Sequence, residues 1–160
     1  MDKPVDKPVE KPTRLVEFET MLLSRHAHLY APRARVGGGH QLDRSAYVLL
    51  SRVSMHGPMS IGQLSEAFGL DASTLNRQTA AMLRAGLVER IPDPDGGIAR
   101  KFRITAEGER RLEADRASNI EGLERVVEHW SPEDVALFAA FLERFNRDIE
   151  RLEGRPWPRP

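Results

Sequence analysis

The sequence contains no cysteine, and this absence removes several kinds of chemistry. Without a thiol there is no disulfide bond, no cysteine nucleophile and no cysteine-based redox sensor. A chain that needs no disulfide is compatible with a reducing compartment, so we expect the cytoplasm.

Long apolar runs are also missing from the sequence. No stretch reaches the roughly 18 to 20 apolar residues that a membrane-spanning helix requires. The N-terminus is polar and lacks the apolar core of a signal peptide. We therefore expect no membrane partner.

The chain has no excess of charge of either sign, because 24 Lys and Arg balance 24 Asp and Glu. The distribution is nevertheless uneven. Residues 13–105 hold 12 basic and 8 acidic side chains, a balance of +4, whereas residues 106–153 hold 7 and 13, a balance of −6. A locally basic surface can attract DNA even when the total charge is zero. The basic segment is therefore the candidate for contact with nucleic acid.

Residues 59–105 contain the clearest series of helix caps and turns. Ser60 can cap a first helix that ends at Gly69, and Asp71 can cap a second helix that ends at Gly86. A turn-forming run over residues 93–97 then separates two short apolar stretches, which predicts a β-hairpin. Helix, turn, helix and hairpin form the outline of a winged helix-turn-helix. We therefore predict a mainly α fold with a small β-hairpin wing, and DNA binding.

The second helix of this segment has two different faces at 100° per residue. Leu75, Thr79 and Met82 share one face, with Leu83 beside them, and Arg77 points away from it. The outer face is small, polar and cationic. Such a face suits the major groove, where amides and hydroxyls bind base edges and guanidinium groups bind guanine or phosphate. On an isolated helix the same face would be ordinary solvated surface, but the flanking turn and hairpin favour DNA contact.

The chain before this segment divides into an arm, a helix, a loop and a second helix. Residues 1–12 repeat a Lys-Pro motif that prevents regular helix, which predicts a disordered arm. Residues 13–30 carry an apolar stripe at helical spacing, and the Pro- and Gly-containing residues 31–42 are typical of a loop. Residues 43–56 begin with a capping aspartate and predict another helix.

Two further helices are predicted after the hairpin. Thr105 can cap a long charged helix over residues 106–128, whose sparse apolar positions predict an extended connector rather than a core element. Ser131 and Pro132 suit the cap and the first residue of a last helix. Residues 154–160 contain three prolines and predict a tail.

The last helix carries a heptad-like apolar seam. Neither this seam nor the stripe of residues 13–30 is needed for a compact winged-helix core. The two can pack on each other within one chain or against a second copy, and we favour a two-fold dimer, which would present two recognition helices to half-sites about one helical turn apart. The seam consists of Phe138, Leu142, Phe145, Ile149 and Leu152. The predicted parts are an arm (1–12), an N-terminal dimerisation helix and loop (13–42), the DNA-binding domain (43–105), C-terminal linker and dimerisation helices (106–153) and a tail (154–160).

Three stretches resemble the MarR family of bacterial transcriptional regulators: LSEAFGLDASTLNR at residues 64–77, LRAGLVER at 83–90 and ITAEG at 104–108. The resemblance covers residues 13–152. It implies a triangular homodimer whose N- and C-terminal helices form the dimer domain, with two winged lobes on pseudo-palindromic DNA. It also implies control by a small anionic or aromatic ligand between the dimer helices and the DNA lobe.

The resemblance further implies which residues contact DNA. Four residues within 73–77 match the recognition positions of the family. The family's wing tip usually carries an acidic residue followed by arginine, whereas residues 96–99 here are Gly-Gly-Ile-Ala and the cations come later. Either Arg100 or Lys101 can enter the minor groove, which attracts guanidinium groups where it is narrow. The candidate residues are Ser73, Thr74, Asn76, Arg77, Arg84, Arg100 and Lys101.

Other candidate sites have weaker support. His26, Tyr30 and Tyr47 lie on helices that border the ligand pocket in similar proteins, and they are equally typical of helix ends and core edges. His26 and His28 diverge on a helix and His40 lies in the glycine loop, so we expect no metal and no other cofactor. No catalytic arrangement of Ser, His and Asp is evident, so we expect no enzyme.

The leading hypothesis is a homodimeric, sequence-specific DNA-binding regulator, a repressor relieved by a small ligand. Its partners are double-stranded DNA, a second copy of the chain and a small-molecule effector. One alternative is a winged-helix interaction protein without specific DNA readout, which the altered wing and the zero net charge would suit. A metal-dependent sensor that uses the histidines is another.

Overall fold

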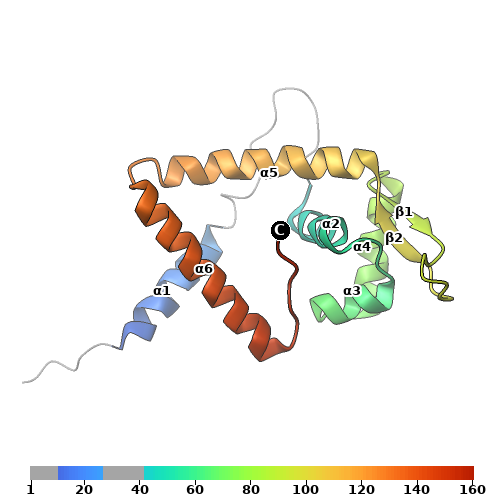
Figure 1. The fold of residues 1–160 in the computed structure, drawn as a ribbon, viewed down its shortest axis with the longest axis horizontal. Coiled ribbons are helices and arrows are strands. Elements are labelled where there is room, and N and C mark those ends of the chain that lie inside the picture. The colour runs from blue at the N-terminus through green and yellow to red at the C-terminus, as the bar shows by residue number, and fades with distance from the viewer. Residues whose placement is uncertain (1–10, 27–41) are drawn as a thin grey trace, which may run out of the picture.

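The computed structural model describes residues 11–26 and 42–160, which form helices and a two-stranded antiparallel sheet. A winged lobe of α2, α3, α4, β1 and β2 occupies one end, α5 extends away from it, and α6 runs back from the far end of α5 (Figure 1). The predicted fold class is confirmed. The elements are α1 (Pro12–Arg25), α2 (Arg44–His56), α3 (Ile61–Phe68), α4 (Ala72–Arg84), β1 (Val88–Ile91), β2 (Lys101–Ile104), α5 (Ala106–Val126) and α6 (Pro132–Glu153).

Side-chain caps fix most helix starts, as predicted. Ser60 and Gln63 form a reciprocal capping box at α3, which satisfies two backbone N–H groups that have no partner within the helix. Gly69 ends α3 with φ +63°, a left-handed conformation that favours glycine. The Thr105 hydroxyl accepts a hydrogen bond from the Gly108 N–H at 3.0 Å and donates one to the Gly86 carbonyl at 2.6 Å. Thr105 therefore starts α5 and joins it to the end of the helix-turn-helix.

The first helix differs from the prediction at both ends. Pro12 rather than Thr13 is its first residue, because proline suits the first helical position. The helix ends at Arg25 and not at residue 30, with the N–H of His26 bonded to the Leu22 and Leu23 carbonyls. Of the arm predicted at residues 1–12, residues 1–10 lie outside the described residues, whereas Lys11 and Pro12 form the start of α1. The glycine loop with His40 and the residues His28 and Tyr30 also lie outside the described residues.

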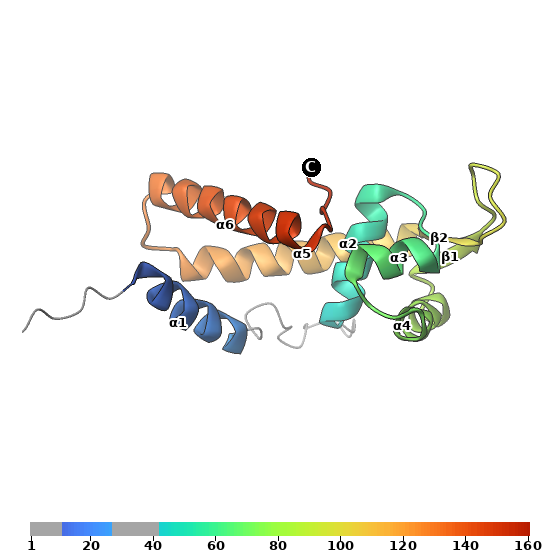
Figure 2. The ribbon, with the colours of Figure 1, turned by 90° about the horizontal axis from the view of Figure 1, so that it is seen from below.

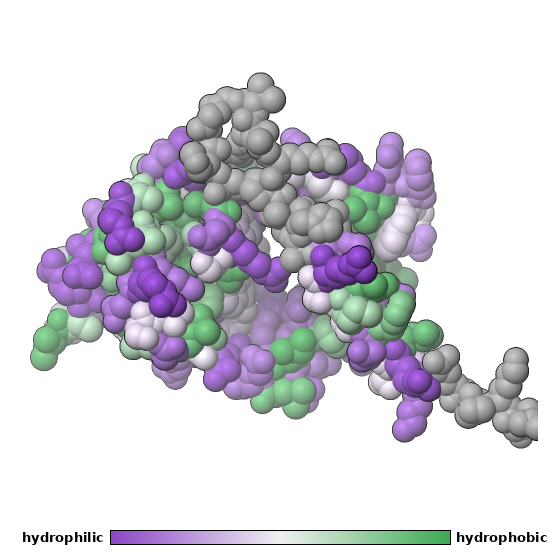
Figure 3. All heavy atoms as spheres, turned by 180° about the vertical axis from the view of Figure 1, so that it is seen from behind, coloured by the Kyte–Doolittle hydropathy of each residue, from purple (hydrophilic) through white to green (hydrophobic). Residues whose placement is uncertain are grey.

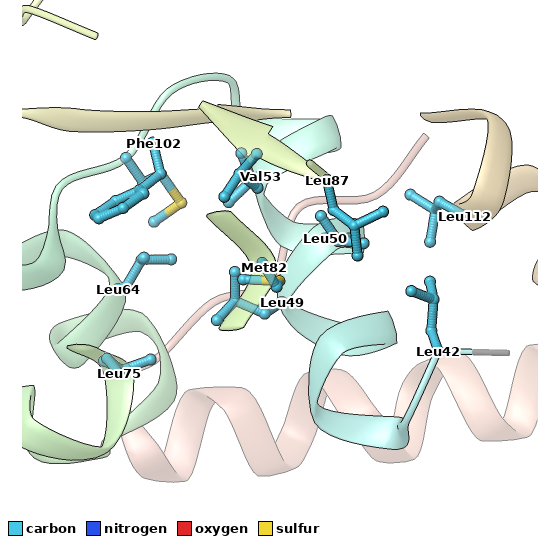
Figure 4. Packing of buried hydrophobic residues seen from close by; sticks show 12 residues of the cluster. Leu42, Leu49, Leu50, Val53, Leu64, Leu75, Met82, Leu87, Phe102 and Leu112 are labelled. Atoms are coloured by element: carbon cyan, nitrogen blue, oxygen red, sulfur yellow. The ribbon is translucent and has the colours of Figure 1, made fainter. Parts of the chain in front are cut away.

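The core lies entirely within the winged lobe and the start of α5 (Figure 4). Leu49, Leu50 and Val53 on α2 form its centre, and each is at most 1% exposed. Leu64 of α3 and Leu75 of α4 pack against the same cluster. The remaining buried apolar side chains are Leu42, Met59, Met82, Leu87, Val88, Phe102 and Leu112.

The wing is an antiparallel hairpin in which Val88 pairs with Ile104 and Ile91 pairs with Lys101. Met59, between α2 and α3, adds a short bridge to this sheet. Its N–H donates to the Phe102 carbonyl at 3.1 Å, and its carbonyl accepts from the Phe102 N–H at 2.8 Å. The base of the wing is thereby held to the helix-turn-helix by backbone hydrogen bonds.

The first half of α5 belongs to the core, which corrects the prediction of a connector along its whole length. Leu112 is 1% exposed and Asp115 is 2% exposed. The Asp115 carboxylate accepts a hydrogen bond from the Leu42 N–H at 2.9 Å, so α5 also holds the segment that leads into α2. The second half of α5 carries exposed apolar residues and extends beyond the lobe (Figure 1).

Helices α1 and α6 contain no buried residue. They lie on opposite sides of α5 rather than packed together (Figure 2), so their apolar stripes do not cover each other within one chain. Apolar patches are accordingly visible among charged side chains at the surface (Figure 3). No described helix is long and apolar enough to cross a membrane. The large apolar side chains exposed on the two helices include Leu15, Phe18, Met21, Leu137, Phe138, Phe141, Phe145 and Leu152.

Candidate nucleic-acid interface

Helix α4 presents the two faces that its periodicity predicts. Leu75, Thr79 and Met82 are buried, and the Thr79 hydroxyl donates to the Leu75 carbonyl at 2.8 Å, which satisfies it inside the lobe. Asn76 and Arg77 are exposed on the other side. The core therefore fixes the rotation of α4, so that the amide of Asn76 and the guanidinium group of Arg77 face outward.

Asp71 organises the first turn of α4. Its carboxylate accepts hydrogen bonds from the Thr74 N–H at 2.9 Å, from the Thr74 hydroxyl at 2.8 Å and from the Ser73 hydroxyl. These bonds, the one from Ser73 first, hold the pKa of Asp71 well below its usual range. Both hydroxyl protons are directed at Asp71. Ser73 and Thr74 therefore offer an outside ligand acceptor oxygens and not donors, a constraint that sequence reasoning missed.

The two wing cations have different surroundings. The Lys101 ammonium lies 2.8 Å from the Asp93 carboxylate and 3.4 Å from that of Asp95, and its side chain is only 10% exposed. The bond to Asp93 raises the pKa of Lys101 and lowers that of Asp93. Lys101 therefore closes the hairpin turn. Arg100 is exposed and forms no ion pair with the described residues.

Two further cations of the wing, Arg103 and Arg90, have partners within the hairpin. Arg103 pairs with Glu89 across the hairpin at 2.7 Å, and the Arg90 guanidinium lies 5.3 Å from the centre of the Phe102 ring. At the tip, Ile98 is fully exposed. Arg84, in the last turn of α4, is exposed as well. Asn76, Arg77 and Arg84 are thus exposed on one helix, and Arg100 is exposed separately on the wing.

An open cavity of about 330 Å³ lies between the start of α2, the helix α4 and α5. Arg77, Gln78 and Arg111 line it together with Asp43 and Ser45, so two cations and one carboxylate face the cavity. Tyr47 is half-buried against the core and His26 is exposed at the end of α1, so neither lines this cavity, and Tyr30 lies outside the described residues. Within residues 11–26 and 42–160, no three His, Cys, Asp or Glu side chains form a group that could hold a metal ion.

The fold and this surface define a winged helix-turn-helix DNA-binding protein. A sequence model of the MarR family matches residues 42–96. The HTH-type transcriptional regulator YxaD of Bacillus subtilis (strain 168) is 36% identical over 134 residues, which cover 83% of this chain and 92% of the relative. The chain therefore belongs to the MarR family of DNA-binding transcriptional regulators.

Solved structures agree on the fold. A MarR family protein from Bacillus stearothermophilus has a TM-score of 0.69 at 23% identity, over 88% of this chain and 99% of that one. The PcaV transcriptional regulator from Streptomyces coelicolor, in complex with its natural ligand, has a TM-score of 0.59 at 18% identity, over 91% and 98% of the two chains.

Proposed function

We propose that this chain is a homodimeric repressor that binds a pseudo-palindromic operator and is released by a small anionic or aromatic ligand. The observation that carries the proposal is the outer face of α4, where Asn76 and Arg77 are exposed opposite three buried residues. An Asn side chain can bind adenine through two hydrogen bonds, and Arg can do the same with guanine. Both residue types suit sequence-specific contact in the major groove.

The remaining candidate residues receive distinct roles in this proposal. Ser73 and Thr74 accept hydrogen bonds from base edges or bridging water, because Asp71 already holds their protons. Arg84 and Arg100 contact phosphates or the minor groove. Lys101 keeps the wing in shape rather than touching DNA, since its ammonium group is enclosed between two carboxylates.

Exposed apolar side chains support the homodimer. Phe138, Phe141 and Phe145 of α6 are 45%, 57% and 47% exposed, and Phe18 of α1 is 50% exposed. Exposed apolar stripes of this kind, one on each helix, mark an interaction site. A two-fold arrangement that buries α1 and α6 would place one winged lobe on each side of the dimer.

Two arginines in the cavity beside α4, Arg77 and Arg111, support control by an anion that binds on their side, away from Asp43. A carboxylate bound next to Arg77 would pair with the guanidinium group that the proposal assigns to DNA. The relative PcaV was solved with its natural ligand, so a ligand-bound state exists in a protein of this fold. His26, Tyr30 and Tyr47 stay predictions for a second part of the ligand site.

The decisive experiment is Arg77→Ala in a gel-shift titration with the DNA beside the chain's own gene, searched for an inverted repeat. We expect specific affinity to fall by about 1–3 kcal/mol per half-site, while the dimer stays intact. Arg116→Ala is the matched control, because Arg116 lies on α5 away from this face and pairs with Glu113.

Wild-type affinity in the Arg77→Ala variant would refute the assignment of α4 as the recognition helix. An equal loss of affinity for operator and for unrelated DNA would show that Arg77 contacts phosphate and not bases. If the wild-type chain itself shows no preference among sequences, the interaction-module alternative takes precedence.

A further inference from the structure

The residues after α6 do not leave the molecule but fold back toward the winged lobe. Gly154 ends α6 with φ +67°, and the Arg155 N–H donates to the Glu150 carbonyl at 3.1 Å. The chain then runs between α6 and α2 to its last residue (Figure 1). Residues 155–160 are called the C-terminal tail below.

The tail is packed on the lobe through Trp157. The Trp157 ring meets the Phe68 ring edge to face, with centroids 5.5 Å apart and planes at 86°. The guanidinium carbon of Arg52 lies 5.0 Å from the centre of the Trp157 ring, and Nη1 of Arg52 donates to the Pro156 carbonyl at 3.0 Å. Arg52 is only 8% exposed. Burial of a guanidinium group is costly without partners, and the tail provides two of them.

The other side of the tail is bound to α6. Glu150 accepts two hydrogen bonds from the Arg159 guanidinium, at 2.6 and 2.9 Å, and one from the Trp157 N–H at 3.1 Å. Arg159 and the Trp157 N–H together lower the pKa of Glu150 to about 2. Paired bonds from arginine to a carboxylate fix orientation as well as distance. The tail is thus held to α6 on one side and to the lobe on the other.

The tail also reaches the turn before the recognition helix. A Cβ atom at Gly69 would lie 2.6 Å from the Arg155 guanidinium carbon, so the Arg155 side chain covers the end of α3. Gly69 precedes the α4 cap Asp71 by two residues. The Arg155 side chain therefore lies against the turn that joins α3 to α4.

Helix α6 takes part in this junction through the polar contacts of Glu150 and not through buried apolar packing. The helix contains no buried residue, whereas Trp157, Pro158 and Arg159 in the tail are partly buried. A tail that only filled space would need neither a buried arginine nor a carboxylate with three hydrogen bonds. The contacts instead connect the dimerisation helix of the proposed function to the helix-turn-helix.

We propose that Arg52, Phe68 and Gly69 form a docking site for the chain's own C-terminal tail, and that the docked tail sets the position of the α3–α4 turn relative to α6. The proposal rests on the DNA binding proposed above and adds a determinant outside the DNA-contacting surface. Operator affinity then depends on the docked tail, although no tail residue touches DNA.

The first test is Trp157→Ala in the full chain. We expect operator affinity to fall by about tenfold, the effect of losing one cation–π and one aromatic contact, with dimer mass unchanged. Trp157→Phe keeps an aromatic ring and should recover most of the affinity. Pro160→Ala, an exposed tail residue, is the matched control and should change nothing.

The second test adds the tail back as a separate molecule. A chain that ends at Gly154 should bind operator weakly, and a synthetic peptide of residues 154–160 should restore its affinity. Circular dichroism checks that this chain is folded. Wild-type operator affinity without the tail would overturn the proposal. The proposal would also be overturned if the shortened chain no longer formed the dimer, or if the peptide failed to restore its operator affinity. In the full chain, a Trp157→Phe variant that binds operator as weakly as Trp157→Ala would overturn it as well.

Docking is also measurable without DNA. In a Trp130→Phe background, Trp157 is the sole tryptophan, because the sequence contains two. Arg52→Met should shift its emission to longer wavelength, and Pro160→Ala should not. Failure of this shift would refute docking whatever the DNA result. A shift in a chain that binds no operator would instead refute the proposed function and leave docking intact.

Discussion

At the scale of single residues, the sequence predicts which side of α4 faces outward because burial follows helical spacing. It does not predict what each polar group is already bonded to. Ser73 and Thr74 direct their hydroxyl protons at Asp71, and Lys101 is enclosed by Asp93 and Asp95. These partners depend on turn conformation, which composition does not specify. The outward face of α4 could therefore be predicted from the sequence, but the donors and acceptors on it could not be assigned, and its contact with DNA stays a prediction.

The difference between the two wing cations can be measured by salt dependence. Arg100→Ala should lower the slope of log affinity against log salt by about one per wing, because one phosphate contact is lost. The double change Lys101→Met with Asp93→Asn removes the ion pair without altering net charge. It should leave the slope as it is and make the wing more susceptible to proteolysis. The reverse pattern would assign the DNA contact to Lys101.

At the scale of helices and strands, the local sequence predicted best the helix starts at which a capping side chain accepts hydrogen bonds from free backbone N–H groups. Ser60, Asp71, Thr105 and Ser131 start helices where they were predicted to. The end of α1 was predicted poorly, because the apolar stripe continues past Arg25 and no residue in it marks a stop. The burial of Leu112 and Asp115 was missed for another reason: it depends on where α5 meets α2, which is a tertiary contact.

Gly108 shows how closely the start of α5 approaches the segment before β1 and the end of β2. A Cβ atom there would overlap the Leu87 carbonyl oxygen and lie 2.7 Å from Cγ1 of Ile104. Gly108→Ala should therefore lower the free energy of unfolding by about 1–3 kcal/mol, although alanine favours helix. Urea denaturation measures this. Gly62→Ala in α3 is the control, because its nearest neighbour, the Ser60 hydroxyl oxygen, would lie at 3.8 Å. A neutral Gly108→Ala would show that the α5 junction is loosely packed.

At the scale of the whole molecule, the buried core formed by residues 11–26 and 42–160 lies at one end, and the described residues form none at the other. The buried apolar cluster occupies the winged lobe and the start of α5, while α1 and α6 expose their stripes. The heptad spacing of α6 indicated this need for a partner from sequence alone. The spacing does not say which surface of the partner it meets, so the dimer stays a prediction.

Phe145→Asp tests the dimer. A carboxylate placed in the shared apolar interface would be buried without a partner, at a cost of about 3 kcal/mol or more. The dimer dissociation constant should then rise by about 100-fold or more, as measured by analytical ultracentrifugation. Arg147→Asp places the same charge two residues away, on the opposite side of α6, and should leave the dimer intact. Equal behaviour of the two variants would argue against α6 as the interface.

The length of α5 sets an angular tolerance for operator recognition. Its 21 residues span about 32 Å at 1.5 Å per residue, with the winged lobe at one end and α6 following the other. Swinging a rod of that length by about 6° moves its tip by about 3.4 Å, which is the rise of one base pair. An effector that rotates α5 by this amount in each protomer would carry both recognition helices out of register with their half-sites, with no change inside either lobe.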